Sequence, residues 1–229
     1  MRSYIVFLLL FSIKVAAKAL CRVRLEWLRE DDDPWADLRV LALLNHTSLF
    51  EPLFLAAVPG RVLWQLATHG VVPLADKTAA RPILGRLFLL LAKHVVPVTR
   101  EKDDTWEEVL RQVEDPEAVL LILPEGRMMR RTGLDLQGNP MTIRGGIADI
   151  LNAMPDGRLF IAYSGGLHHI QAPGERFPRP FRSAWLGAEV VDIPTYRGRL
   201  ARGRDPDAFK AAVIEDLTRR RDAYCYRER

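Results

Sequence analysis

The sequence predicts an α/β fold, with a mixed, mostly parallel sheet flanked by helices and an N-terminal apolar helix that contacts a membrane. Short apolar runs rich in strand-forming residues alternate along the chain with segments of helical pattern. That alternation is typical of strands connected by helices that pack on a sheet. The 229 residues are enough for one sizeable domain, and no break in composition requires a second one.

The N-terminal segment predicts membrane contact. Residues 4–13 form an uncharged, mostly apolar run, and residues 15–20 continue it around Lys18. A helix that crosses a bilayer needs roughly 20 apolar residues, and Lys14 and Lys18 leave the run short of that. We therefore expect residues 1–20 to form a membrane-associating helix that dips into one leaflet. Two alternatives stay open: a cleaved signal peptide and a helix buried in the core.

Strands and helices alternate after this segment. Strands are expected at residues 22–27, 38–44, 62–67, 95–98, 118–123, 159–163 and 184–191. Helices are expected at residues 48–57, 81–92, 105–113 and 145–153. A last helix begins at Asp205 and Pro206, because Asp is a good N-cap and Pro suits the first helical position. Phe209, Val213 and Leu217 then recur every four residues and give that helix an apolar face.

The composition is that of a globular protein, with 48% hydrophobic and 27% charged residues. Cys21 and Cys225 lie near opposite ends of the chain and belong to no Cys-x-x-Cys or Cys/His cluster, so no metal site is expected. Reduced thiols in a reducing compartment are the simpler interpretation, with one disulfide as the alternative.

The net charge of +4 comes entirely from the C-terminal tail. Residues 197–229 contain ten Lys or Arg and six Asp or Glu, and the rest of the chain is balanced. A basic tail can meet anionic lipid or nucleic acid, or it can be a solvated helix end, where Arg suits the negative end of the helix dipole. No aromatic and basic strand motif accompanies the tail, so we expect no nucleic-acid partner.

The segment Asn45-His46-Thr47-Ser48-Leu49-Phe50-Glu51 follows an apolar strand directly. A side chain at a strand end reaches the crevice where α/β folds bind ligands, and histidine is the usual general base for a hydroxyl. A carboxylate that orients the ring improves such a base, and Glu51 is near enough in sequence to do so. The structural alternative is a capping box, in which Ser48 and Glu51 only start a helix.

Two further strand ends carry charged residues. Residues 123–131 contain Glu125 and Gly126 followed by Arg127, Arg130 and Arg131, and residues 95–100 end in Arg100. Arginines beside an open backbone turn suit a phosphate. The alternative is an ordinary turn with solvated arginines. Three polar strand ends in one sheet indicate a single site.

In order and separation these blocks resemble the glycerolipid acyltransferases related to lysophosphatidic acid acyltransferase. That family has an Asn-His-x4-Asp block, a block ending in Val-x-Arg, a Phe-Pro-Glu-Gly-Thr-Arg block and a short apolar stretch with proline. The corresponding segments here are residues 45–51, 95–100, 123–130 and about 159–166. Glu51 replaces the family's Asp, Arg127 and Met128 replace its Thr-Arg, and the last segment lacks its proline.

The resemblance implies an acyltransferase domain at residues 21–229 that acts in phospholipid biosynthesis. It implies direct transfer of a fatty acyl group from acyl-CoA or acyl-carrier protein to a hydroxyl of a lysophospholipid or related glycerolipid, without a cofactor, at the cytoplasmic face of a membrane. His46 is the expected base, with Glu51 orienting it. The expected substrate-binding residues are Arg100, Glu125, Gly126, Arg127 and Arg130.

Three other functions compete with this one. The departures from the family blocks favour a catalytically silent lipid-binding relative as the main alternative. A hydrolase that releases the acyl group to water and a nucleic-acid-binding protein are less favoured. The sequence sets no oligomeric state.

Overall fold

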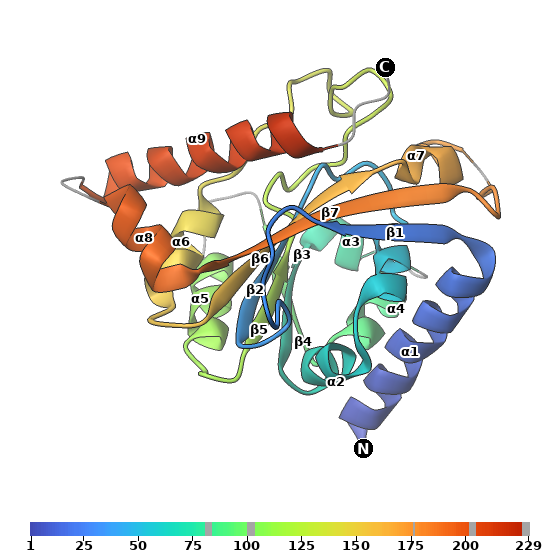
Figure 1. The fold of residues 1–229 in the computed structure, drawn as a ribbon, viewed down its shortest axis with the longest axis horizontal. Coiled ribbons are helices and arrows are strands. Elements are labelled where there is room, and N and C mark those ends of the chain that lie inside the picture. Colours follow the sequence, from blue (N-terminus) through green and yellow to red (C-terminus); the bar gives the residue numbers. More distant parts are fainter. Residues whose placement is uncertain (81–83, 100–103, 176, 202–204, 226–229) are drawn as a thin grey trace.

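The computed structural model describes residues 1–80, 84–99, 104–175, 177–201 and 205–225. The described residues form a seven-stranded sheet in the order β1-β7-β6-β2-β5-β3-β4 (Figure 1). The strands are β1 (Arg22–Trp27), β2 (Leu38–Leu44), β3 (Gly70–Ala75), β4 (His94–Val98), β5 (Val119–Ile122), β6 (Arg158–Gly165) and β7 (Ser183–Asp192). The predicted fold class, a mixed and mostly parallel sheet flanked by helices, is confirmed.

Five neighbouring strands, from β6 to β4 in the sheet order, run parallel to one another. β7 is antiparallel to β6, and β1 is parallel to β7. The carboxyl ends of the five parallel strands therefore lie at one edge of the sheet. Three of the predicted site segments follow β2, β4 and β5, so they start from this edge.

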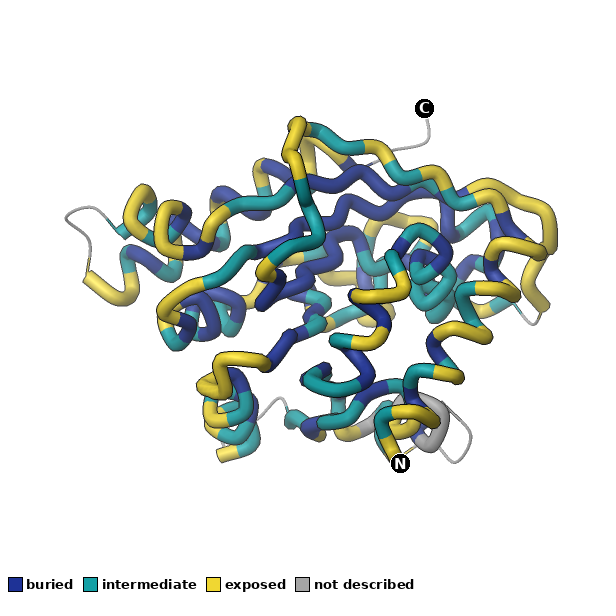
Figure 2. Tube along the Cα trace, turned by 60° about the horizontal axis from the view of Figure 1, so that its bottom comes forward, coloured by how far each residue is buried: buried dark blue, intermediate teal, exposed yellow. Residues whose placement is uncertain are grey.

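Helices cover both faces of the sheet. α1 (Arg2–Leu20), the 3-10 helix η1 (Glu51–Ala57) and α2 (Gly60–His69) pack on one face, while α5 (Thr105–Val113), α6 (Gly146–Ala153), α8 (Ile193–Ala201) and α9 (Pro206–Tyr224) pack on the other. The shorter helices are α3 (Asp76–Ala79), α4 (Leu84–Leu91) and α7 (Leu167–Ile170). Figure 2 shows the central strands of the sheet as the buried layer between them.

β2 is buried along its whole length and divides the core in two. Val40, Ala42 and Leu44 belong to the cluster on the α5, α6 and α9 side, and Leu41 and Leu43 belong to the cluster on the α1 and α2 side. This alternation is the period-two pattern of a strand. A strand that is apolar on both faces is what a parallel sheet covered by two helical layers requires.

Most predicted elements are confirmed with end shifts of a few residues, but the strand predicted at residues 62–67 is wrong. That segment lies inside α2, and the strand is the next segment, β3. The buried residues are Val62, Leu63, Leu66 and Ala67, a helical spacing rather than an alternating one. The helix predicted at residues 48–57 is the 3-10 helix η1, and α3, α7 and α8 were not predicted. Of the helix predicted at 81–92, residues 81–83 lie outside the described part.

α1 lies against the domain with one side and exposes the other. Val6, Leu10 and Ala17 are buried against the domain, and the Lys14 ammonium donates to the Val58 carbonyl just after η1. Among the described residues α1 is the one helix long and apolar enough to cross a membrane. Of the residues in its most apolar 18-residue stretch, 17% are buried in the protein. The thiols of Cys21 and Cys225 are both free and buried.

The C-terminal arginines that the structure describes contact protein groups. Arg197 donates to the Met154 carbonyl at 2.9 Å, and Arg220 pairs with the buried carboxylates of Glu189 and Asp216. α9 starts as predicted, with the Asp205 side chain accepting from the Ala208 amide at 2.8 Å. Much of the positive charge of the tail thus serves packing of α8 and α9.

Candidate active site

His46 lies at the carboxyl edge of the parallel strands, two residues after the end of β2. Asn45, the residue between them, has a φ of 68°, in the left-handed region that Asn tolerates better than most residues. Its side-chain amide donates to the Ser164 carbonyl at 2.8 Å, and its own carbonyl accepts from the Ser164 hydroxyl at 2.8 Å. These two bonds to the end of β6 fix the turn from which His46 extends.

Glu51 is hydrogen-bonded to the His46 ring. Its Oε1 atom lies 2.8 Å from Nδ1 of His46, and the two side chains are 11% and 13% exposed. The same oxygen accepts from the Ser48 amide at 3.1 Å. Glu51 therefore faces the imidazole and makes one of the two bonds of a capping box. The Ser48 hydroxyl accepts from the Phe50 amide at 3.2 Å instead of closing the box. With Nδ1 facing Glu51, Nε2 is the ring nitrogen available to a ligand.

The Glu125 carboxylate holds the backbone at His46. β5 and β2 are neighbours in the sheet, so the residues that follow them meet. Glu125 is 2% exposed, and its oxygens accept from the amides of His46 at 2.7 Å and of Asn45 at 3.2 Å. The Met129 amide in turn donates to the His46 carbonyl at 2.7 Å. The loop after β5 thus fixes His46 through its backbone.

Gly126 forms the turn of that loop. Its φ is 60°, and its amide donates to the Leu123 carbonyl at 2.9 Å. A Cβ at this position would meet only the Arg144 side chain, at 3.8 Å. The backbone angle, rather than a lack of space, is therefore the reason for glycine here.

The pKa of His46 lies above its ordinary value of 6.5. Burial by itself favours the neutral ring and lowers the pKa, but the negative charge and hydrogen bond of Glu51, together with the charge of Glu125, outweigh it. A histidine with a raised pKa is a stronger base, and its protonated form is stabilised where it stands. The arrangement can therefore take a proton from a hydroxyl at Nε2.

Arg127 is next to the histidine loop and has an incomplete set of partners. One of its terminal nitrogens pairs with Asp135, a carboxylate that is buried and also accepts from the Asn139 and Gln137 amides. Its Nε is buried, and no acceptor for it exists among the described residues. Burying an unsatisfied charged donor is costly, so this nitrogen is a candidate contact for an anionic ligand.

Arg130 contacts a neighbouring loop. Arg130 lies farther along the loop, and its Nη1 donates to the Pro173 carbonyl at 3.3 Å. Arg100 lies outside the described residues. The structure therefore brings together His46, Glu51, Glu125, Gly126 and Arg127, with Arg130 attached to the neighbouring loop.

Two residues at the site were missed by sequence reasoning. Ser164 at the end of β6 holds Asn45, and Arg221 on α9 donates to the Met141 carbonyl at 3.0 Å and lies 3.5 Å from the Glu125 carboxylate. They are separated from their partners by 119 and 96 positions. No local pattern marks such contacts, because the sheet order and the packing of α9 create them.

A hollow of about 700 Å³ lies elsewhere, at the amino ends of the strands. Its lining includes Leu38 and Arg158, the first residues of β2 and β6. It contains none of the predicted site residues. Within the described part of the chain, no group of three or more His, Cys, Asp or Glu side chains could hold a metal ion.

Comparison of the sequence with protein-family models and with curated proteins finds no match. Among solved structures, the fold is similar to the crystal structure of the 1-acyl-sn-glycerophosphate (LPA) acyltransferase PlsC from Thermotoga maritima. The TM-score is 0.59 at 18% sequence identity, over 95% of this chain and 81% of that chain. At this identity the likeness shows a common fold.

Proposed function

We propose that this chain is an O-acyltransferase that moves a fatty acyl group from acyl-CoA or acyl-carrier protein to a hydroxyl of a lysophospholipid or related glycerolipid. The observation that carries the proposal is the buried His46–Glu51 pair at the carboxyl edge of the sheet. The fold shared with a PlsC acyltransferase and the order of the sequence blocks support it.

His46 acts as the general base at Nε2. It takes the proton of the acceptor hydroxyl while that oxygen attacks the thioester carbonyl, so that a new C–O bond forms and the C–S bond breaks. The thiolate of the carrier then takes the proton back from His46. Glu51 orients the ring and offsets its positive charge during the step. Because both reactants are held beside one base, proximity supplies about 7–11 kcal/mol of the barrier reduction.

Glu125 and Gly126 serve the site through the backbone. Both Glu125 oxygens accept from backbone amides, so Glu125 positions His46 rather than contacting the acceptor. The acceptor phosphate is bound by Arg127, through its buried Nε, and by Arg130 and Arg100. Arginine suits this role because its planar fork of donors matches phosphate oxygens.

The acceptor is an amphiphile, and the chain meets it at a membrane through α1. Exposed apolar residues run along α1, namely Tyr4, Ile5, Leu8, Phe11, Val15 and Leu20. A helix with one side on the protein and an apolar side open fits an interfacial helix that lies in the headgroup region. We propose that the cytoplasmic leaflet is the one contacted.

Thiol release from acyl-CoA, and separately from acyl-carrier protein, tests the activity with a panel of lysophospholipids and glycerol 3-phosphate. Release should depend on an acceptor and should fall at least about 100-fold in His46→Ala, while the circular dichroism spectrum is kept. His69→Ala, a histidine outside the site, is the matched control. Wild-type turnover in His46→Ala would refute the base. Lipid binding without release from either donor would favour the silent lipid-binding alternative.

A further inference from the structure

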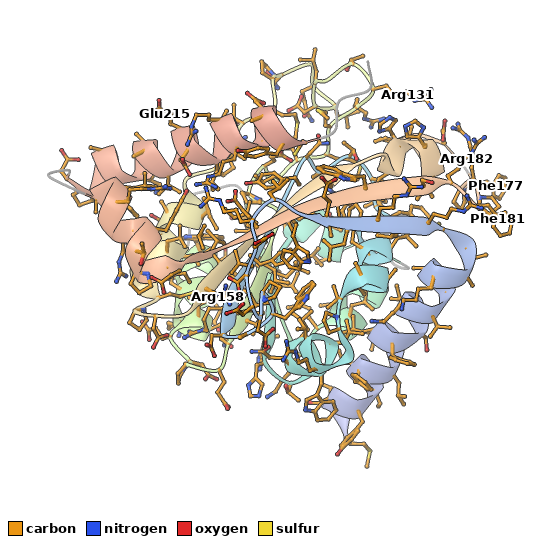
Figure 3. The ribbon with its side chains drawn as sticks, viewed as in Figure 1. Arg131, Arg158, Phe177, Phe181, Arg182 and Glu215 are labelled. Atoms are coloured by element: carbon orange, nitrogen blue, oxygen red, sulfur yellow. The ribbon has the colours of Figure 1, made fainter. Side chains whose placement is uncertain are left out.

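The connection between α7 and β7 exposes two phenylalanine side chains. Phe177 and Phe181 are 74% and 71% exposed, the highest values among aromatic residues of the described chain. Figure 3 shows them together with Arg182 at one edge of the molecule, beside the C-terminal end of α1. Large apolar side chains in this degree of contact with water are unfavourable, so a group of them on one edge indicates a partner.

This segment is joined to the end of α1. The Phe181 amide donates to the Leu20 carbonyl at 2.6 Å, and the Arg22 amide donates to the Arg182 carbonyl at 3.0 Å. The two phenylalanines therefore extend the exposed apolar side of α1 to a second element. Phe181 has a φ of 60°, which is unusual for a bulky residue, so the loop holds this side chain outward at some cost in backbone energy.

The surroundings of the two rings are cationic. Lys18, Arg22 and Arg182 are exposed, and in the described part of the chain neither arginine has an acidic partner. Arg179, between the phenylalanines, pairs with Glu175. Apolar rings flanked by unpaired cations fit an anionic bilayer, where the rings enter the acyl boundary and the cations meet lipid phosphates. A bilayer also explains why the two rings lie beside α1, the helix proposed to contact the membrane, whereas a protein partner would not explain that position.

The same connection contacts the loop of the candidate site. Glu175 pairs with Arg131 at 3.0 Å, and the Pro173 carbonyl accepts from Arg130 at 3.3 Å. A segment that inserts into the bilayer would thus lie next to the loop that carries Arg127. An amphiphilic acceptor leaving the membrane at this edge would have a short path to the site.

We propose that the segment 177–182 is a second membrane contact, in which Phe177 and Phe181 insert into an anionic bilayer surface and Arg22 and Arg182 bind its phosphates. The proposal rests on the membrane association of α1 proposed above. It is specific to this segment, and it does not require that the chain be catalytically active.

Co-sedimentation of the full chain with vesicles of equimolar phosphatidylglycerol and phosphatidylcholine tests the proposal. Phe177→Ser/Phe181→Ser should lower the partition coefficient about tenfold, because two ring insertions are lost. Leu136→Ser is the matched control, since Leu136 is 70% exposed on a different loop, and it should partition like the wild type. An unchanged coefficient in the double variant, or an equal loss in the control, would overturn the proposal.

Three variants make the test independent of folding and of catalysis. Phe177→Trp/Phe181→Trp should keep binding, and its added emission should shift to the blue and be quenched by brominated lipid; no quenching would overturn insertion. Arg22→Gln/Arg182→Gln should lose the preference for phosphatidylglycerol over pure phosphatidylcholine, and a kept preference would overturn the phosphate contact. His46→Ala should bind vesicles like the wild type, because membrane binding does not need the catalytic base. Vesicle binding can therefore be interpreted even if the proposed acyl transfer is not found.

Discussion

At the scale of single residues, His46 is fixed at three points. Its amide donates to Glu125, its carbonyl accepts from Met129 and its Nδ1 faces Glu51. The contact with Glu51 acts most directly on the ring, because it provides a negative charge at hydrogen-bond distance, and the charge of Glu125 adds to its effect on the pKa. The carboxylate of Glu51 therefore sets both the orientation and the basicity of His46.

Glu51→Gln should lower the plateau of kcat/KM about 100-fold or more, because the amide cannot offset the charge of the protonated ring. Because the pKa of His46 lies above 6.5, a higher pH than usual is needed before the neutral ring, which is the base, predominates. Without the carboxylate that pKa falls, so the acidic limb of the pH profile should move to lower pH. Measurement of kcat/KM from pH 5 to 9 checks both effects.

The thermal midpoint shows whether the cap is kept in this variant. The side-chain amide oxygen that Glu51→Gln introduces can still accept from the Ser48 amide, so the midpoint of this variant should stay near that of the wild type. Unchanged turnover and an unmoved pH profile in this variant, at that midpoint, would show that Glu51 only caps the turn.

At the scale of elements, α9 reaches across to the loop after β5. Arg221 is 14% exposed, donates to the Met141 carbonyl and lies 3.5 Å from the Glu125 carboxylate. Its positive charge opposes that of Glu125, which is one of the groups that raise the pKa of His46. Burial first and the negative charge of Glu125 second raise the pKa of the Cys225 thiol, so this thiol stays neutral.

Arg221→Gln should therefore move the acidic limb of kcat/KM to higher pH, since the full charge of Glu125 then acts on His46. The expected change is opposite in sign to that of Glu51→Gln. Arg219→Gln on the same helix is the control, because Arg219 is 70% exposed and pairs with Asp216. A lower plateau with the limb unmoved would mean that Arg221 acts on the structure of the loop alone.

At the scale of the whole molecule, a buried charge network joins α9 to α8, β6 and β7. Arg220 pairs with Glu189 on β7 and with Asp216 on its own helix, and these three side chains are 2–7% exposed. Tyr163 donates to Glu189, and Tyr196 donates to Asp216 at 2.8 Å. Burial and the adjacent carboxylates raise the pKa of both phenols, so the hydroxyls stay protonated donors.

Arg220→Met should lower the free energy of unfolding by about 3 kcal/mol, because it leaves two buried carboxylates with weaker partners. The value stands at the low end for a broken buried pair, since Arg29 and Arg219 still contact Glu189 and Asp216. Urea unfolding followed by circular dichroism measures it. Arg219→Gln, whose arginine is itself 70% exposed, should change the free energy by less than about 1 kcal/mol. Equal losses in the two variants would argue against a special role for the buried network.

The sequence by itself determined the alternation of strands and helices and the positions of the chemical groups at strand ends. Apolar pattern and capping residues act within a few positions, so β2, β5, α5 and the start of α9 could be predicted. The same local view failed at residues 62–67, where the apolar run was assigned to a strand although its burial has helical spacing. His46 and Glu51, five positions apart, could be paired before the fold was known.

Only the tertiary structure decided how distant segments meet. The sheet order places β5 beside β2 and β6 on the other side of it, which brings Glu125 and Ser164 to the turn at Asn45. The packing of α9 brings Arg221 to Glu125, and the β1–β7 pairing brings Phe181 to the end of α1. These contacts join residues about 80 to 160 positions apart, and their free energy comes from burial of the whole sheet, which no local pattern of residues contains.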